Sequence, residues 1–394
     1  MENNKRLKIG LFLDNFYPNI DGVVLVVDNL AKMLSKFNDV VVVVPDNDSS
    51  DEDFLRPYKV IRISSISIPF TEYFLGKRKT KVSKEFRMLL DENFDIIHIH
   101  SPFTIGRLGQ KIATKLNVPC IATMHTRFDF EIRKIINNKL VVKTIIKNII
   151  KVYNRCDNCI AINHAMIKVF NDYGYNGTTK VIYNGTDLLP LKEQEKEKRI
   201  EIVNKLYDLK PSDTLLIFVG RITDIKNIFF ILDSLKLLKE ENFPFKMLYV
   251  GSGPDEKKLK EKIKEYELDK DVKVIGRITD REILSGIYAR ASLLLFPSLF
   301  DASSLVQIEA AVHETPGLFI SGSVTSDTVT NGVNGFTSED SVFSYKDTIK
   351  EILEDKKRLE VVSKNAQKML GKNWSDIALD TYEFYLEEIN KKNS

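Results

Sequence analysis

Short apolar runs alternate with longer helix-forming segments along almost the whole sequence. Residues 40–44 are five consecutive valines, and comparable runs occupy 8–13, 60–63, 95–100, 119–123, 158–163, 180–183, 215–219, 246–250, 272–275 and 293–296. Continuous apolar runs of this length are typical of strands buried on both faces of a parallel sheet, with helices as the crossovers between them. The sequence therefore predicts an α/β protein.

The chain is too long for one ordinary hydrophobic core, because its 394 residues exceed the size at which single cores stop growing. We expect two doubly wound parallel-sheet, Rossmann-like domains at residues 1–188 and 189–372, followed by a last helix within 373–394. Two such domains would face a central cleft, since ligands of open α/β sheets bind beyond the carboxyl ends of the strands.

The composition is that of a globular protein, with 43% hydrophobic and 29% charged residues. No apolar run reaches the roughly 18 residues of a membrane span, and the first six residues are polar. We therefore expect a cytoplasmic location. Cys156 and Cys159 form a CxxC pattern, but without a second pair or a histidine at ligand spacing we favour buried structural cysteines over a redox or metal site.

Charge is spread unevenly along the chain. Residues 1–186 hold 27 Lys and Arg against 19 Asp and Glu, whereas the remainder holds 31 against 36. The basic half includes a predicted helix over 131–155 with lysines at four-residue steps, namely Lys139, Lys143, Lys147 and Lys151. Such a helix could lie against an anionic membrane, or it could simply pack its apolar face on the domain core. Nucleic acid is not expected as a partner, because no aromatic residues interleave the stripe.

Residues 220–227 follow a predicted strand and open a helix. Arg221 offers a planar fork of donors and Lys226 a compact positive charge. Together at a helix N-terminus these groups suit a diphosphate and would stabilise the charge that grows on a nucleoside-diphosphate leaving group. The alternative is an ordinary solvated basic loop.

Residues 296–311 combine two carboxylates with a helix start. Asp301 lies in a loop after a buried strand, Ser303 and Ser304 are good helix N-cap residues, and Glu309 lies about two turns into the helix that follows. The free N–H groups of a helix N-terminus suit an anion, and carboxylates accept hydrogen bonds from sugar hydroxyls. This stretch therefore predicts a site for a polyol joined to a phosphate.

Two further strand ends in the first half carry candidate site residues. Gly22 closes the first strand–loop–helix turn, where a missing side chain lets backbone approach a phosphate, and His125 ends a later strand. Two DxD patterns, at 46–48 and 51–53, could hold a divalent metal, but in a polar surface loop we favour solvated acids. No HxxxH, HExxH or GxSxG spacing occurs, so zinc or serine hydrolase chemistry is not supported.

These residues together resemble the retaining glycosyltransferases of family 4, which have the GT-B fold. The resemblance spans nearly the whole chain and rests on the early glycine turn, segments 100–103, 125–126 and 182–187, the Arg221/Lys226 pair, segment 251–254, residues 297–298, the pair Asp301 and Glu309 at the family's Glu-x7-Glu spacing, and 331–336. The Gly22 turn and the basic helix look like the branch that glucosylates diacylglycerol.

The resemblance implies specific residue functions. Arg221 and Lys226 would grip the donor diphosphate and Glu309 the ribose, while Gly22 would line the phosphate. It implies further that His125 and Asp301 contact the donor sugar and that backbone near Ser303, Ser304 and Leu305 holds the sugar hydroxyls. Backbone at Arg277 and Ile278 would contact the base. The resemblance also implies that no metal or other cofactor is needed and that the last helix crosses back onto the first domain.

The sequence departs from the family pattern at three positions. Asp301 replaces a longer Glu, Ser304 stands where Gly is frequent, and Glu314 stands where a Gly precedes a strand. We expect a retaining, metal-independent enzyme that moves a glucose-like hexose from a UDP-sugar to a hydroxyl of a lipid, glycan or protein, at the inner face of the cell membrane. The departures keep open, as an alternative, a catalytically silent GT-B subunit that binds a partner glycosyltransferase or its protein substrate. A nucleotide-sugar epimerase on the same architecture is a third possibility.

Overall fold

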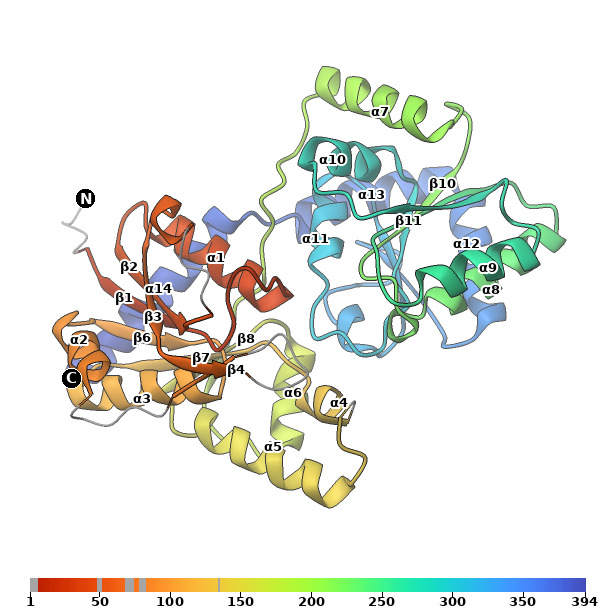
Figure 1. Ribbon diagram of the computed structural model, residues 1–394. Coiled ribbons are helices and arrows are strands. Elements are labelled where there is room, and N and C mark those ends of the chain that lie inside the picture. Colours follow the sequence, from red (N-terminus) through yellow and green to blue (C-terminus); the bar gives the residue numbers. More distant parts are fainter. Residues whose placement is uncertain (1–5, 48–51, 68–73, 78–82, 134) are drawn as a thin grey trace. The chain divides into compact units, whose positions relative to one another are not determined.

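The computed structural model describes residues 6–47, 52–67, 74–77, 83–133 and 135–394, which form two units (Figure 1). The first unit comprises Met1–Asn184 and Trp374–Ser394, and the second comprises Gly185–Asn373. The sequence placed the boundaries at 188/189 and 372/373. Each unit has its own sheet and core and is described separately.

The first unit is built on a parallel sheet of seven strands in the order β3-β2-β1-β6-β7-β8-β9. Its described strands are β1 (Lys8–Phe12), β2 (Asp39–Pro45), β3 (Lys59–Ile63), β6 (Ile96–Ile99), β7 (Cys120–Met124), β8 (Asn158–Ala161) and β9 (Thr179–Val181), and β4 (Ser65–Ser67) pairs antiparallel with β5 (Phe74–Gly76) outside it. Its described helices are α1 (Gly22–Leu34), η1 (Asp53–Leu55), α2 (Lys84–Asp91), α3 (Thr104–Leu116), α4 (Phe128–Arg133), α5 (Lys139–Tyr153), α6 (His164–Asp172) and α14 (Trp374–Asn393).

The register of this sheet follows from its apolar runs. The five valines of β2 are all buried, and Val41 and Val43 pair with Gly10 and Phe12 of β1. Strands β2 and β3 are added on one side of β1 and strands β6 to β9 on the other, so the strand order reverses between β1 and β6. In a doubly wound sheet this switch point is where a crevice opens at the carboxyl ends of the strands.

Helix α14 belongs to the first unit, although it follows the second in sequence. It packs against α1, and the ribbon places the blue C-terminal helix beside the red N-terminal one (Figure 1). Two buried polar contacts fix it: the Tyr385 hydroxyl lies 2.7 Å from His98 Nδ1, and Asn158 Nδ2 donates to Glu388 Oε1 at 3.1 Å. The last helix therefore completes the core of the first unit.

The second unit repeats the architecture with six parallel strands in the order β12-β11-β10-β13-β14-β15. Its strands are β10 (Leu215–Val219), β11 (Lys246–Val250), β12 (Val272–Gly276), β13 (Leu293–Leu295), β14 (Gly317–Ile320) and β15 (Phe336–Ser338). Its helices are α7 (Glu193–Tyr207), η2 (Asp224–Lys226), α8 (Ile228–Glu240), α9 (Glu256–Glu265), α10 (Arg281–Arg290), α11 (Leu305–Val312), η3 (Val324–Ser326), α12 (Val342–Glu354) and α13 (Lys356–Leu370). The switch point lies between β10 and β13.

The predicted α/β class with two doubly wound parallel sheets is confirmed. One predicted element is wrong: the basic segment 131–155 is not a single helix. Helix α4 ends at Arg133 and α5 begins at Lys139, with the Asn138 side chain accepting hydrogen bonds from the Leu140 and Val141 N–H groups. An N-cap asparagine starts a new helix because it satisfies N–H groups that have no partner in a preceding turn. Residue 134 lies outside the described part of the chain.

Candidate functional site

The loop after β10 presents the two predicted cations. Lys226 ends η2, and the next residue, Asn227, has a left-handed backbone (φ 56°) and donates from Nδ2 to the Pro297 carbonyl at 2.8 Å. This bond ties the β10 loop to the loop after β13. The Arg221 side chain is exposed, and among the described residues it makes no hydrogen bond or ion pair. One cation is therefore fixed in place and the other is open to an anion.

Lys226 faces Asp301 in the β13 loop. The Lys226 Nζ and Asp301 Oδ1 form an ion pair, and the ammonium lies 5.8 Å from the centroid of the Phe296 ring. The second carboxylate oxygen, Asp301 Oδ2, is buried and has no hydrogen-bond partner among the described residues. A buried carboxylate oxygen without a donor is costly, so a donor at this position would be stabilising.

Helix α11 begins directly after this loop. Ser304 is its N-cap, and the Ser304 Oγ accepts from the Gln307 N–H at 3.2 Å. Ser303 precedes the cap and Leu305 is the first helical residue. The Ser304 hydroxyl is thus used for capping, while the backbone N–H groups of the first turn remain the anion-attracting end of the helix.

Glu309 is held from two sides inside the second unit. Its Oε1 accepts from Arg281 Nη2 at 3.2 Å and its Oε2 from the buried Tyr288 hydroxyl at 2.7 Å. Burial raises the pKa of the Glu309 carboxyl, and the positive charge of Arg281 opposes that rise. The carboxylate is therefore fixed in orientation and depends on a cation for its ionisation.

Arg277 and Ile278 follow β12. Gly276 before them has a positive φ of 76°, so the chain turns sharply at the strand end. Arg277 is exposed, whereas Ile278 packs against the core of the unit. No hydrogen bond or ion pair in the described part of the chain joins either residue to Lys226, Asp301 or Glu309.

In the first unit, Gly22 begins α1 after the loop that follows β1, whereas His125 comes directly after β7. Gly22 is the exposed first residue of α1, where a Cβ atom would meet nothing within 4 Å. His125 follows β7 and is only 9% exposed, with its Nε2 lying 3.0 Å from His100 Nδ1. Burial lowers the pKa of His125 to about 3, so the ring is neutral near pH 7 and its Nε2 is already occupied.

The sequence did not reveal several residues that organise these sites. Arg281 and Tyr288 lie on α10 and meet Glu309 only through the fold; their seven-residue spacing puts both on one face of a helix but names no partner. Asp14 after β1 accepts hydrogen bonds from the Ile105 N–H at 2.7 Å and from the Ser101 and Thr104 hydroxyls, and so fixes the start of α3. An aspartate directly after a predicted strand is a weak sequence signal that could have indicated this role of Asp14.

Other features of the described residues hold no candidate chemistry. No group of three or more His, Cys, Asp or Glu side chains there is placed to hold a metal ion. Of the DxD residues, Asp53 pairs with Arg62 at 2.6 Å, and Asp48 and Asp51 lie outside the described residues. In the same described segments, no helix combines the length and apolar character that crossing a bilayer requires.

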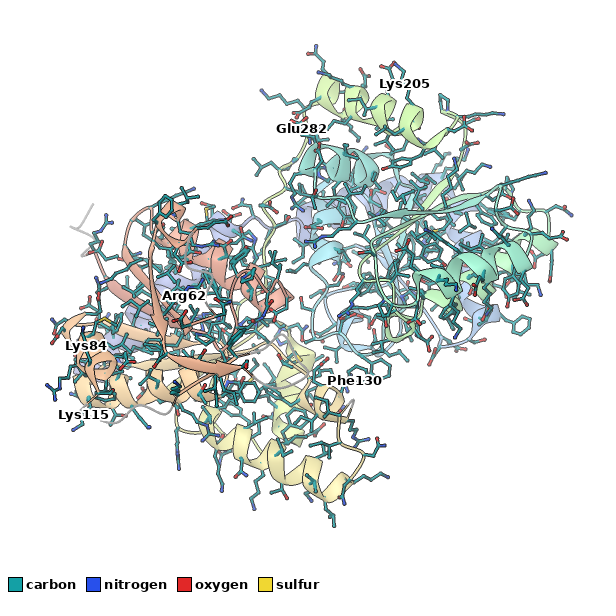
Figure 2. All side chains as sticks on the ribbon, in the orientation of Figure 1. Arg62, Lys84, Lys115, Phe130, Lys205 and Glu282 are labelled. Atoms are coloured by element: carbon teal, nitrogen blue, oxygen red, sulfur yellow. The ribbon has the colours of Figure 1, made fainter. Side chains whose placement is uncertain are left out.

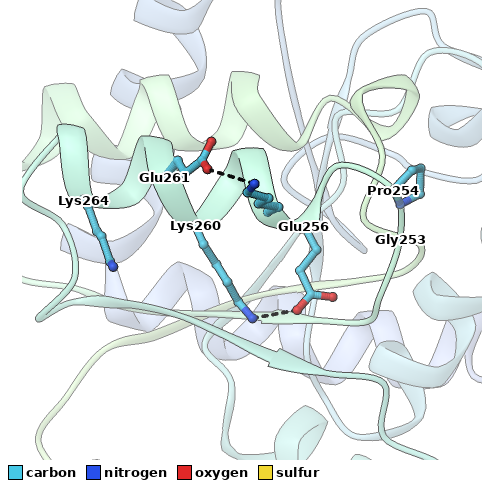
Figure 3. A pocket seen from close by; sticks show the side chains of 7 residues that line it. Gly253, Pro254, Glu256, Lys260, Glu261 and Lys264 are labelled. Atoms are coloured by element: carbon cyan, nitrogen blue, oxygen red, sulfur yellow. Dashed lines mark hydrogen bonds and ion pairs between the residues drawn. The ribbon is translucent and has the colours of Figure 1, made fainter.

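A surface pocket of about 510 Å³ lies along α9 and the 251–254 turn (Figure 3). Its charged walls are largely self-neutralised, because Lys260 pairs with Glu256 at 2.6 Å and Lys257 with Glu261 at 4.0 Å. Close packing of the backbone explains Gly251 in this turn, because a Cβ atom there would lie 1.8 Å from the Gly220 carbonyl oxygen. None of the predicted site residues lines this pocket.

Two family comparisons cover most of the chain. Residues 200–369 match the family described as "Glycosyl transferases group 1", and residues 20–188 match "Glycosyltransferase Family 4". The first match contains the β10 and β13 loops with Glu309, and the second contains Gly22 and His125. The chain belongs to glycosyltransferase family 4, with the GT-B fold.

Curated relatives of this family 4 protein are similar over 70% or more of their length. The chain is 24% identical to an alpha-monoglucosyldiacylglycerol synthase of Acholeplasma laidlawii, over 98% of this chain and 100% of the relative. A synthase of the same name from Streptococcus pneumoniae is 25% identical over 79% of this chain and 70% of the relative. A GDP-mannose-dependent alpha-mannosyltransferase of Corynebacterium glutamicum is 24% identical over 99% and 91%.

Solved structures share the GT-B fold of this family 4 chain. Anabaena HepE, crystallised in complex with UDP, superposes with a TM-score of 0.77 at 18% identity over 97% of this chain and 100% of that one. Sucrose-phosphate synthase from Thermosynechococcus elongatus superposes with a TM-score of 0.71 at 18% identity, over 97% and 99%. At these identities the likeness concerns the fold.

Two of the three departures from the family 4 pattern have a structural explanation. Ser304 caps α11, as described above. Glu314 has a left-handed backbone (φ 60°), the conformation that explains a glycine in the family, and its carboxylate pairs with Lys196 of α7 at 2.8 Å. The third departure, Asp301, lies directly in the candidate site. Of the three departures, Asp301 is therefore the one expected to change the chemistry of the site.

Proposed function

We propose that this family 4 glycosyltransferase is a retaining, metal-independent hexosyltransferase that uses a UDP-sugar donor and a hydroxyl acceptor. The observation that carries the proposal is the meeting of Lys226 with Asp301 at the switch point of the second sheet, beside the open Arg221 and the start of α11. A cation pair and a helix N-terminus suit a diphosphate, and a carboxylate with an unused oxygen suits a sugar hydroxyl.

Charge stabilisation is the chemistry that this arrangement supplies. When the glycosidic bond to the nucleoside diphosphate breaks, negative charge grows on the departing phosphate. In the proposal, Arg221 and Lys226 stabilise that charge, so that no metal ion is needed to do so. The acceptor hydroxyl then attacks from the face that the diphosphate leaves and passes its proton to the departing phosphate oxygen, and this same-face attack retains the anomeric configuration.

A glucose-like donor linked to UDP has support from the relatives. Two are named as synthases of a glucosyl lipid, and Anabaena HepE was crystallised with UDP and glucose. The GDP-mannose-dependent relative is a reason to include guanine donors in any test. The shorter Asp301 withdraws the carboxylate by one methylene, so we expect the choice among hexoses to depend on it.

A lipid acceptor fits the surface of α5. Lys139, Lys143, Lys147 and Lys151 are all exposed along this helix, while its opposite face is buried in the core through residues such as Ile146 and Ile149. The start of the helix also exposes apolar side chains, Leu140 at 77% and Val141 at 43%. Exposed apolar side chains beside a row of lysines are the combination with which a peripheral protein contacts an anionic membrane. We propose that this surface is the inner face of the cell membrane.

His125 would serve by hydrogen bonding rather than by proton transfer. Its ring is neutral near pH 7, and its Nε2 is engaged by His100. Only Nδ1 remains to meet a hydroxyl. We therefore assign it to orientation of a sugar or acceptor hydroxyl.

The test is a screen of UDP- and GDP-hexoses for release of free nucleoside diphosphate, with and without diacylglycerol or monoglucosyldiacylglycerol in anionic vesicles. We expect release that requires both a UDP-hexose and a lipid acceptor, and an α-linked product by NMR. Donor conversion without any acceptor would favour an epimerase instead. Activity that disappears when trace divalent metal is chelated would contradict metal independence.

A silent GT-B subunit remains the second candidate, and one observation favours it. Lys226 is neutralised by Asp301, so the chain fills its own anion site. Calorimetry with UDP separates the two proposals. A silent subunit would show no binding at millimolar UDP, whereas a transferase must bind the nucleotide.

A further inference from the structure

Arg281 lies between two carboxylates in the second unit. It is the first residue of α10, whose N-cap Asp280 accepts from the Glu282 and Ile283 N–H groups. The same Arg281 Nη2 forms an ion pair with Asp187 and donates to Glu309 Oε1 at 3.2 Å. The side chains of Asp187 and Arg281 are half exposed, at 50% and 40%, whereas Glu309 is 15% exposed.

The Glu309 carboxylate keeps room for a ligand while held in this way. Arg281 takes one lone pair of Oε1, and the Tyr288 hydroxyl takes one of Oε2. A carboxylate can accept about four hydrogen bonds, so one position on each oxygen is left. Two neighbouring ribose hydroxyls need two such acceptors.

Glu309 can accept these hydrogen bonds on both oxygens only when its carboxyl group is ionised. Its surroundings shift its pKa in opposite directions. Burial raises its pKa most, Arg281 and Tyr288 lower it, and the negative charge of Asp187 raises it. The helix α13 packed against α11 contributes Gln367, which is neutral and donates to the Val312 carbonyl at 2.8 Å. Glu309 therefore depends on one shared cation.

We propose that Arg281 is a positioning residue for the nucleotide ribose, that it holds Glu309 as an ionised and oriented carboxylate, and that Asp187 weakens this action by competing for the same guanidinium. This inference rests on the proposed function, in which Glu309 binds the ribose. It adds two residues of opposite sign, neither of which needs to touch the nucleotide.

The experiment measures UDP affinity by calorimetry between pH 5.5 and 8 in the full chain. Replacing Arg281 with Gln raises the pKa of Glu309, so binding is lost at a higher pH; we expect affinity about tenfold weaker than wild type at pH 6 and a smaller difference at pH 8, since one pKa unit corresponds to a tenfold change. Asp187→Asn removes the competitor and should strengthen binding at pH 6 by roughly threefold. The titration of the UDP phosphate is common to all variants and cancels in the ratios.

A ligand lacking the ribose hydroxyls gives a readout that a merely structural effect would not move. With 2′,3′-dideoxy-UDP, Arg281→Gln and wild type should bind equally weakly. Arg199→Gln is the matched control, because Arg199 of the same unit pairs with Glu195 and the exposed Glu282 but not with Glu309 (Figure 2). That control should leave all affinities unchanged.

Two results would overturn the inference. One is an Arg281→Gln variant with the affinity ratio to wild type constant across pH, and the other is equal losses for UDP and its dideoxy analogue. Both are measured on a protein that binds UDP. Absence of UDP and GDP binding in the wild type would instead contradict the proposed function itself.

Discussion

Lys226 and Asp301 neutralise each other in the second unit, at the switch point between β10 and β13. Both side chains are about four-fifths buried, with exposed fractions of 23% and 21%. If a diphosphate binds there as proposed, it would draw the ammonium away from its carboxylate, and a sugar hydroxyl could then replace the ammonium on Asp301. In the proposed function, the pair would keep the two charges satisfied until both parts of a nucleotide sugar arrive together.

Lys226→Ala should leave the fold intact and lower turnover on the order of a hundredfold, the scale of losing one charge-stabilising group. Steady-state kinetics of the purified variant with a UDP-hexose would measure the effect. Lys205→Ala is the control, because Lys205 is 75% exposed on α7 and points to solvent (Figure 2). Equal turnover of the Lys226→Ala variant and wild type would remove the assignment of the diphosphate site.

The buried histidines should make the protein less stable as pH falls. Burial lowers the pKa of His313 to about 4 and that of His125 to about 3, below the ordinary value of 6.5. The unfolded chain therefore takes up protons more readily from pH 6.5 downward, and each histidine removes up to about 1.4 kcal/mol of stability per pH unit until its folded pKa is reached.

Chemical denaturation of the wild type and of His313→Gln, repeated from pH 7.5 to 4.5, checks this prediction. The variant loses the contact of Nε2 with the Ser285 hydroxyl at 2.9 Å, so we expect lower stability at pH 7 but a shallower decline toward pH 4.5. Parallel curves for the two proteins would show that His313 does not cause the decline.

Glu314→Gly should be tolerated, although it restores the family residue. Relief of a left-handed backbone favours glycine, while loss of the partly exposed Lys196 pair and the greater freedom of the unfolded chain oppose it, so the free energy of unfolding should change by less than about 1 kcal/mol. Turnover and UDP affinity should stay at wild-type values. A gain of donor affinity in this variant would instead connect Glu314 to the nucleotide site.

Charge reversal on α5 tests the membrane proposal. Replacing Lys143 and Lys147 with Glu should abolish sedimentation with anionic vesicles at low salt, since each basic residue near such a surface contributes about 1 kcal/mol. Replacing Lys257 and Lys264 of α9 in the same way gives a control of equal charge. Wild-type binding that is absent even at low salt would mean that the stripe is only a solvated face.

The local sequence was sufficient to predict the helices and strands of the sheets and their order along the chain. Runs such as the five valines of β2 are buried on both faces, as in a parallel sheet covered by helices on both sides. Together with the alternating helical segments, they are why the α/β class could be predicted. Lys226, Asp301 and Glu309 could be proposed as site residues because each follows a predicted strand or helix start. The break between α4 and α5 was missed, because an asparagine in a polar segment gives only a weak signal for a cap.

Which side chains meet was decided by the tertiary structure. Nothing in the spacing of Lys226 and Asp301, or of Arg281 and Glu309, predicts a salt bridge, because each pair joins segments that come together only when β10, β13 and α10 take their places around one core. The sequence determined which charges the protein carries at its strand ends. The packing of the sheet and helices determined which of those charges neutralise one another and which, like Arg221, remain open to a ligand.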